Sequence, residues 1–243
     1  MLTPDLPRRN HLLAALSEDD YIRLLPHLEG IELTKGQVVA ESGVSQGYVY
    51  FPTSSLFALL WPMEDGAQIQ TGLVGNEGVA GIGLCFGTLG IPGRTVVQSR
   101  GYAYRLAAAV LKAEFDRRGL LQHLLLRFTQ VLLIQMAQSA VCREHHSIEQ
   151  QLCRWLLLTL DGSPSDPLAQ ANDSIADMPD GRRAGMTEAA NQLKAGEVLQ
   201  YRDGKIALDR PKLELRVCDC YSIGKVELDG LFPRKPVSAH QPA

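Results

Sequence analysis

The feature that most constrains the fold is a predominantly apolar segment, residues 120–142, that contains polar residues but neither glycine nor proline. Leu121, Leu125, Phe128 and Leu132 recur in it at helical spacing. A helix of ~23 residues is about 35 Å long, which exceeds the usual globular helix. One apolar face can cover a core while another meets a second chain, so the pattern favours a homodimer seam over a purely internal helix. We expect the seam to contain Leu121, Leu125, Phe128, Leu132 and Met136.

The stretch before this helix is typical of a β-rich unit. Between residues 30 and 106, short β-branched or aromatic segments alternate with glycine-containing turns. Many short strands at regular spacing indicate an antiparallel sandwich, barrel or roll. Asn10 and Ser17 are expected to cap two short helices that precede the strands. The expected strands are residues 31–33, 38–40, 48–51, 56–61, 68–73, 95–98 and 103–106.

The stretch after the long helix has the element order of a DNA-binding module. A helix over residues 147–160 is followed by a turn and by two shorter helices, 171–178 and 182–195. Two strands then flank a tight turn at Asp203-Gly204. Helix, turn, helix and β-hairpin is the order of a winged helix-turn-helix. We therefore predict an α+β protein with four parts: a sensor domain (1–118), a dimerisation helix (119–145), a winged helix-turn-helix (146–222) and a disordered tail (223–243).

Composition and charge narrow the class of protein. The 243 residues are 45% apolar and 21% charged, which is ordinary globular composition. No apolar run reaches ~18 residues and no signal-peptide pattern follows the polar N-terminus, so we expect a cytoplasmic protein without membrane contact. Five widely spaced cysteines fit reduced thiols better than disulfides. The net charge is −6 over residues 1–180 and +3 over residues 181–243, a difference that suggests two partners or arises by chance.

Several local stretches, together with this order of elements, resemble the CRP/FNR family of bacterial transcription regulators. The resemblance covers residues 10–222 and implies a cyclic-nucleotide-binding-type β-roll, a dimerising helix and DNA-binding transcription control. It also implies double-stranded DNA, a second copy of the chain and RNA polymerase as partners. The stretches are Tyr48-Val-Tyr-Phe-Pro52, Val74-Gly-Asn-Glu-Gly78, Val96-Val-Gln98, Cys142 with His146, Arg154-Trp-Leu-Leu157, Arg182-Arg183, Thr187-Glu-Ala-Ala190, Ala195-Gly196, Asp209-Arg210, Leu213-Glu214 and Cys218-Asp-Cys-Tyr221.

The resemblance also implies which residues would meet DNA. Arg183 and Glu188 would face bases, and Arg182 a base or a phosphate, since an arginine fork can pair with guanine and a glutamate can accept from cytosine. Thr187 lies beside them on the same helix. Further phosphate contacts are expected from Lys194, Arg202 and Lys205. The alternative for these residues is an ordinary solvated surface.

This module departs from the family pattern at two places. Its first helix opens with Ala171-Asn172-Asp173, and the turn before the arginines is Pro179-Asp180-Gly181. Proline should end the first helix by Met178, and Asp180 adds a negative charge beside the expected phosphates. The alternative function is therefore a ligand-binding or protein-interaction module whose degenerate helix-turn-helix no longer binds DNA.

The expected effector site is incomplete as a cyclic-nucleotide pocket. Arg94-Thr95 matches the phosphate-binding half of the family pattern, but the glycine-rich segment 81–87 lacks the acid that would bind the ribose. The sequence thus favours the roll without cyclic-nucleotide binding, and no cofactor is identified. The candidate effector-binding residues are Gly75, Glu77, Gly78, Arg94 and Thr95.

The cysteines and histidines of the sequence are candidate metal ligands, and no common enzyme motif accompanies them. No cysteine precedes Cys85, so the N-terminal iron–sulfur cluster of oxygen-sensing relatives has no ligands here. Cys142, His145, His146 and Cys153 would point to different faces of one continuous helix, which favours a structural His146 at a bend. Cys218-Asp-Cys220 is a candidate metal or redox pair, but we expect no metal site. Without a phosphate-binding loop, a nucleophile elbow or a zinc-protease motif, we expect no enzyme.

Overall fold

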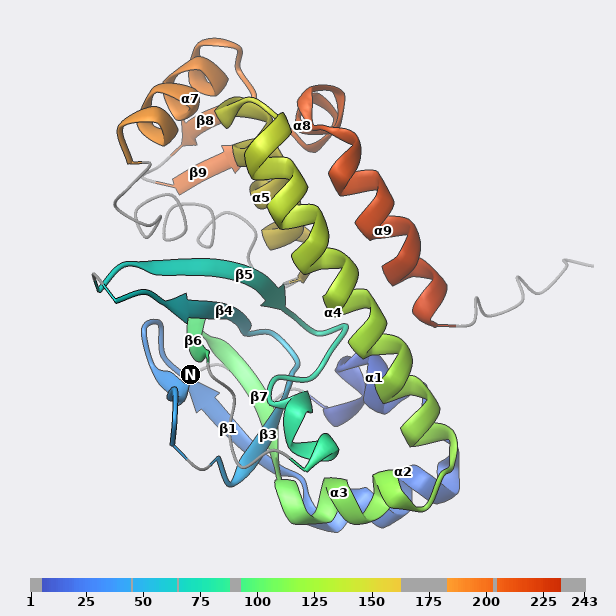
Figure 1. Ribbon diagram of the computed structural model, residues 1–243. Coiled ribbons are helices and arrows are strands. Elements are labelled where there is room, and N and C mark those ends of the chain that lie inside the picture. The colour runs from blue at the N-terminus through green and yellow to red at the C-terminus, as the bar shows by residue number, and fades with distance from the viewer. Residues whose placement is uncertain are drawn as a thin grey trace, which may run out of the picture.

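The structure is a computed structural model that describes residues 6–44, 46–64, 66–87, 93–162, 183–202 and 205–232 (Figure 1). Its helices are η1 (Pro7–Arg9), α1 (His11–Ala14), α2 (Glu18–Leu24), η2 (Leu25–His27), η3 (Ile82–Phe86), α3 (Ala108–Asp116), α4 (Leu120–His145), α5 (Ile148–Gly162), α7 (Arg183–Ala195), α8 (Arg210–Arg216) and α9 (Asp219–Leu231). Its strands are β1 (Glu29–Leu33), β2 (Val38–Ala40), β3 (Tyr48–Pro52), β4 (Leu56–Pro62), β5 (Gln68–Val74), β6 (Arg94–Ser99), β7 (Gly101–Ala107), β8 (Leu199–Arg202) and β9 (Lys205–Leu208).

The first seven strands form the expected β-roll. One sheet has the order β1-β7-β3 and the other β2-β6-β4-β5, and every strand pair is antiparallel. All seven strands predicted from the sequence are present, with ends that differ by a few residues. β5 is an edge strand, so one side of its backbone has no strand partner. The α+β fold class with a β-roll is therefore confirmed.

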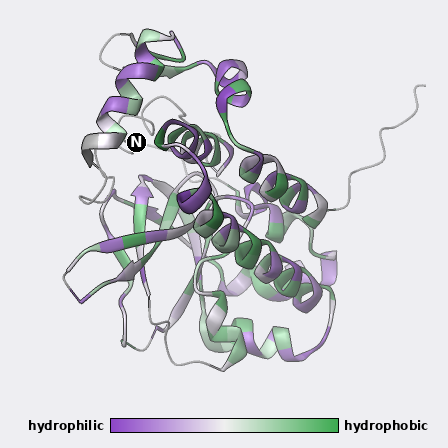
Figure 2. Ribbon diagram, turned by 45° about the horizontal axis from the view of Figure 1, so that its top comes forward, coloured by the Kyte–Doolittle hydropathy of each residue, from purple (hydrophilic) through white to green (hydrophobic). Residues whose placement is uncertain are grey.

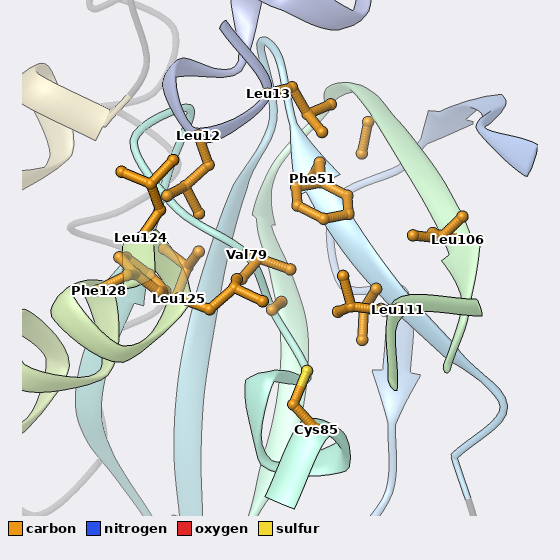
Figure 3. Packing of buried hydrophobic residues seen from close by; sticks show 14 of the residues in the cluster. Leu12, Leu13, Phe51, Val79, Cys85, Leu106, Leu111, Leu124, Leu125 and Phe128 are labelled. Atoms are coloured by element: carbon orange, nitrogen blue, oxygen red, sulfur yellow. The ribbon is translucent and has the colours of Figure 1, made fainter. Parts of the chain in front are cut away.

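One hydrophobic core joins the roll to the long helix α4. Leu124, Leu125 and Phe128 of α4 point toward Val79 and Leu12 from the roll and from α1 (Figure 3). The Phe128 ring occupies the space above Gly78, where an added Cβ would come within 2.1 Å of the ring. Glycine at position 78 thus lets the helix lie directly on the turn after β5.

Most of the residues expected to form the dimer seam lie instead in the hydrophobic core between α4 and the β-roll. Leu121, Leu125, Phe128 and Leu132 are buried in the core of the roll, which corrects the assignment, and only Met136 is exposed. The error arose because the apolar residues of α4 are not confined to one face, so helical spacing alone did not distinguish Leu125 from Leu133. Figure 2 shows apolar and polar residues mixed along this helix. The apolar face left exposed carries Leu126 and Leu133.

Length and composition would also allow α4 to cross a membrane, and no other described helix passes that test. The core helix of a soluble protein passes the same test. Leu125 and Phe128 of α4 belong to the core of the roll, and 28% of the most apolar stretch of the helix is buried in the chain.

The C-terminal helix α9 was not expected from the sequence. We predicted that residues 223–243 form a disordered tail, and this is wrong for residues 223–231, which continue α9. α9 runs alongside α4 in the opposite direction (Figure 1), with Cys218 beside Cys142 at one end and the Gly230 carbonyl bonded to Arg127 at the other. Leu231 is buried and Leu228 and Phe232 pack on the same core, which explains why the helix continues. Residues 233–243 lie outside the described part of the chain.

The described part of the winged module sits above the β4–β5 hairpin (Figure 1). α5, α7, α8 and the β8–β9 hairpin share a second core that contains Leu152, Leu156, Leu193 and Leu213. The outer face of α5, with Trp155 and Leu158, packs on Leu56 and Leu73 of the roll. The expected first helix, 171–178, and the turn 179–181 lie outside the described residues.

Asn10 and Ser17 are both N-cap residues, but only Asn10 also bonds to the roll. Comparing substitutions at the two positions therefore measures what those bonds contribute to stability. Asn10 is buried, accepts from Leu13 N, and donates to the carbonyls of Pro52 (2.9 Å) and Gly78 (2.8 Å). Ser17 caps α2 in the same way but at an exposed position. Replacing Asn10 by Ala leaves two buried carbonyls unpaired, so the free energy of unfolding should fall by about 2–4 kcal/mol.

The matched control is Ser17→Ala, for which a loss of about 0.5–1 kcal/mol is expected. Urea unfolding followed by circular dichroism measures both. Equal losses in the two variants would show that the bonds from Asn10 to the roll contribute nothing beyond capping.

Candidate functional site

Helix α7 presents two chemically different faces. Ala189 and Leu193 are buried and Met186 is partly buried against α5, as expected for a helix packed on its module. Thr187, Glu188 and Lys194 lie on the exposed face. Glu188 accepts a hydrogen bond from Gln192 Nε2 at 3.3 Å. Three of the expected DNA-contacting residues, Thr187, Glu188 and Lys194, therefore share the outer surface of this helix.

For the remaining residues expected to contact DNA, the structure gives the position in the fold. Arg183 is the first residue of α7, Arg202 ends β8 and Lys205 begins β9. α7 and the β8–β9 hairpin are thus both at the end of the molecule away from α3 (Figure 1). Arg182 lies outside the described residues.

A polar cluster at the end of α5 holds the C-terminal helices in place. Asp161 forms an ion pair with Arg210 of α8 (2.7 Å) and accepts a hydrogen bond from the Tyr221 hydroxyl of α9 (2.7 Å). Arg210 also donates to Tyr221 Oη and pairs with Glu214. Burial and the bond to Asp161 raise the pKa of Tyr221, so it stays a neutral donor. Sequence analysis noted Arg210 and Tyr221 only as part of the resemblance.

The turn after β5, residues 75–78, is the point where the roll meets both α4 and α5. Asn76 N donates to the carbonyl of Gly162, the last residue of α5, at 3.2 Å. An added Cβ on Gly75 would lie 2.1 Å from that same carbonyl oxygen. Since Phe128 already covers Gly78, this turn is filled by the chain itself.

Glu77 is the titratable group of this turn. Its carboxylate accepts from Gly75 N at 2.8 Å. Burial raises the pKa of Glu77 to about 7, and the nearby charge of Asp161 acts in the same direction. The neutral carboxyl is therefore favoured in the folded chain, at the contact between the roll and the winged module.

The five expected effector-binding residues do not form one site. On β6, Arg94 and Thr95 lie opposite Leu60 and Leu59 of β4. On β5, Val74 lies opposite Phe57 of β4, and Gly75 comes directly after Val74. The two groups are thus about 10 Å apart along the strands, at 3.3 Å per residue. Arg94 Nε lies 3.1 Å from Glu41 Oε2, and Thr95 is buried. The structure does not assemble the expected pocket from these residues.

A cavity of about 390 Å³ lies elsewhere, between the edge strand β5 and the helices α4, α5 and α7. Its apolar wall includes Trp155, Leu158 and Met186. Arg154 and Arg143 supply cationic groups, and Arg143 donates to the Gln70 carbonyl of β5 at 2.9 Å. The volume is in the range of small-molecule sites. Sequence analysis missed this cavity because its walls come from segments far apart in the chain.

Four potential metal ligands meet where α4 ends and α9 begins. The ligand atoms of Cys142, His146, Cys218 and Cys220 all lie within 4.8 Å of one another. Burial and the neighbouring Cys218 raise the pKa of the Cys142 thiol to about 12. The sequence grouped Cys142 and His146 with Cys153 and treated Cys218 and Cys220 separately. The structure instead brings Cys142 and His146, at the end of α4, together with Cys218 and Cys220, at the start of α9.

Comparisons with known proteins identify the fold. A scan against protein-family models gives no match, and no curated protein matches by sequence. FixK2 from Bradyrhizobium japonicum is 12% identical, with a TM-score of 0.62 over 79% of this chain and 98% of FixK2. CLP, a c-di-GMP-responsive global regulator of Xanthomonas campestris, is 16% identical, with a TM-score of 0.57 over 79% of this chain and 99% of CLP. A protein of the Crp/Fnr family from Eubacterium rectale is 11% identical, with a TM-score of 0.57 over 86% of this chain and 98% of its own.

These likenesses show the fold. The chain has the architecture of CRP/FNR regulators: a cyclic-nucleotide-binding-like β-roll, a long helix and a C-terminal helix-turn-helix unit with a wing. Each neighbour is covered over nearly its whole length, so the likeness includes both the roll and the C-terminal unit. At identities of 11–16% the likeness carries the fold and not the activity.

Glu77 makes the stability of this junction dependent on pH. The folded chain holds its proton up to about pH 7, above the ordinary value of 4.5. This contribution to stability is full below about pH 4.5 and is lost as the pH rises through about 7. Replacing Glu77 by Gln removes the loss, so the variant should gain stability relative to the wild type as the pH rises from about 5 to 8.

Thermal unfolding at a series of pH values measures the effect. Glu32→Gln, at an exposed position of β1, corrects for the removal of one negative charge. Profiles for the wild type and Glu77→Gln that stay parallel over the whole range would contradict the assignment.

Proposed function

We propose that this protein is a cytoplasmic, homodimeric transcription regulator that reads a pseudo-palindromic DNA site. The observation that carries the proposal is the arrangement of α7 on a CRP/FNR architecture. One face of α7 is packed against α5 through Leu193, and the other exposes Thr187 and Glu188 to solvent. A recognition helix needs this division, because it must be held rigidly while its outer side chains reach base edges.

Charge supports the same assignment. The segment 181–243 carries a net charge of +3, whereas residues 1–180 carry −6. Arg183 at the start of α7 and the pair Arg202 and Lys205 beside the hairpin turn put cations on the two elements that a winged module brings to DNA. No catalytic motif competes with this interpretation, so we expect a regulator without enzymatic activity.

The first test is selection of bound fragments from randomised duplex DNA, followed by titration over a salt series. We expect a two-fold symmetric motif whose half-sites lie about one helical turn apart, with affinity that falls steeply with salt. Arg183→Ala should weaken binding to that site by about 1–3 kcal/mol. Arg100→Ala, which removes the same charge from an exposed turn of the roll, should leave the affinity unchanged.

Two outcomes would contradict DNA reading. One is weak binding that is equal for all sequences, which would favour the alternative of a ligand-binding or interaction module. Repeating the selection after replacing Pro179-Asp180-Gly181 by Leu-Gly-Val would then show whether the turn is the cause. The other is an equal loss of affinity in Arg183→Ala and Arg100→Ala, which would remove Arg183 from the base contacts.

The dimer seam is now assigned to the exposed face of α4. Leu126, Gln130, Leu133, Ala137 and Ala140 are all exposed and follow one another at spacings of four, three, four and three residues. This is the alternation of a two-stranded coiled coil. A second copy of α4 would bury the apolar face that the chain leaves uncovered.

The seam is tested by placing a charge in it. Leu133, whose exposed fraction is 62%, should give monomers when replaced by Glu, because the carboxylate would be buried against its copy. The matched control is Leu215→Glu, at an 87% exposed leucine of α8 outside the seam. Sedimentation velocity separates the two states. Dimers of Leu133→Glu at the same concentration as the wild type would contradict the new assignment.

The signal would enter through the cavity rather than through the expected pocket. A small molecule between β5 and α5 would touch the roll on one side and Met186 of α7 on the other. Binding there would therefore favour one placement of the recognition helix over another. The DNA site obtained by selection supplies the probe with which such effectors, cyclic nucleotides included, are screened.

A further inference from the structure

We propose that Cys142, His146, Cys218 and Cys220 bind a single Zn²⁺ ion that fastens helix α9 to the hinge at the end of α4. The proposal does not depend on DNA binding, because it concerns how the C-terminal helices are attached. Three of the five cysteines and one histidine take part.

The spacing of the ligand atoms fits one tetrahedral ion. Cys142 Sγ and Cys218 Sγ are 3.6 Å apart, and Cys220 Sγ and His146 Nδ1 are 3.5 Å apart. Around zinc with Zn–S bonds of 2.3 Å, neighbouring ligands in a tetrahedron are about 3.8 Å apart. In an iron–sulfur cluster the four protein ligands are divided between two or four iron atoms, so some of them lie farther apart than the 4.8 Å that spans all four here. The geometry therefore favours a single ion with a Cys₃His ligand set.

Local structure explains how these ligands converge. Cys142 lies in the last turn of α4, and His146 is the C-cap residue of that helix, whose backbone N donates to the Cys142 carbonyl at 3.2 Å. Cys218 is the N-cap residue of α9, and Cys220 lies in its first turn. All three cysteines are buried, so the ligands face inward between the two helix ends.

The surroundings of His146 match those of a metal-bound imidazole. Its Nδ1 faces Cys220, while its Nε2 lies 3.5 Å from Asp219 Oδ1. Metal-binding histidines commonly place the second ring nitrogen against a carboxylate, which fixes the ring and raises its basicity. Asp219 would have this positioning role and would not itself bind the ion.

Arg154 supplies the charge that such a site needs. It is buried on α5, and within the described part of the chain no carboxylate pairs with it. Its guanidinium makes only long hydrogen bonds, to Ser139 Oγ at 3.3 Å and to the Gln135 carbonyl at 3.4 Å. Three thiolates and one divalent cation leave one negative charge in the interior. A buried cation beside the cluster compensates that charge, and the cluster in turn explains the burial of the arginine.

The experiment measures the metal directly in the full-length protein. Protein purified under reducing conditions should contain about one zinc ion per chain, as measured by inductively coupled plasma mass spectrometry. After removal of zinc, Co²⁺ should restore one equivalent, with the intense visible bands of tetrahedral cobalt and a thiolate charge-transfer band in the near ultraviolet. Cys218→Ala and Cys220→Ala should each lower that charge-transfer band and weaken binding.

Matched controls separate ligation from general damage. Cys153→Ala removes a buried thiol of α5 that lies outside the cluster, and it should retain one equivalent of metal. Asp219→Asn should lower the affinity about tenfold while leaving the thiolate band unchanged, since it alters only the partner of His146. If an alanine variant fails to fold, alkylation of the wild type answers the same question: chelation should expose Cys142, Cys218 and Cys220 together.

Three results would overturn the proposal. One is reduced wild-type protein that neither contains zinc nor takes up one equivalent of Co²⁺. Another is full metal binding in Cys218→Ala and Cys220→Ala. The last is a protein whose peptide map shows a Cys142–Cys218 disulfide in place of metal. Each of these readouts is independent of DNA binding, so failure here and failure of the regulator assignment are distinguishable.

Discussion

The rest of the structure depends on a single constraint, the need to cover a long helix whose apolar residues lie on more than one face. The β-roll covers one face of α4 through Leu125 and Phe128, and α9 lies along another. Leu126 and Leu133 remain exposed on the third. Because an apolar face of this length is stable only when it is buried, the chain's own fold leaves a place for a second copy. The proposed dimer would thus follow from the same pattern that builds the core.

The two ends of helix α5 are where the parts of the molecule meet. The turn at Gly75 touches Gly162 of α5, and Asp161 beside it binds Arg210 and Tyr221 of the C-terminal helices. The Cys/His cluster lies at the other end of α5, and it shares Cys142 with the cavity. A metal ion or a ligand would therefore act near the start of α5, and a proton on Glu77 near its last residue, Gly162. A shift of α5 from either end can be passed to α7, which packs on it.

Sequence patterns predicted the positions of strands and helices better than they predicted which surfaces those strands and helices pack against. Alternating β-branched segments and glycine turns predicted all seven strands of the roll, and capping residues such as Asn10 and Ser17 located the first helices. The same periodicity placed the dimer seam on the wrong face of α4, because Leu125 and Leu133 are equally apolar. The regular spacing of Tyr221, Leu228 and Leu231 could have indicated α9, but it was assigned to a tail.

The sequence by itself determined the seven strands of the roll, the long helix, the helices α5 and α7 and the hairpin that follows, and hence the architecture shared with CRP/FNR proteins, but not α8 or α9. These properties depend on neighbouring residues, since periodicity, turns and caps are local. Only the tertiary structure decided that Cys142 and His146 meet Cys218 and Cys220, that Arg94 is remote from Glu77, and which face of α4 stays exposed. These properties depend on how segments that are distant in the sequence pack together, and a local sequence pattern does not contain that information.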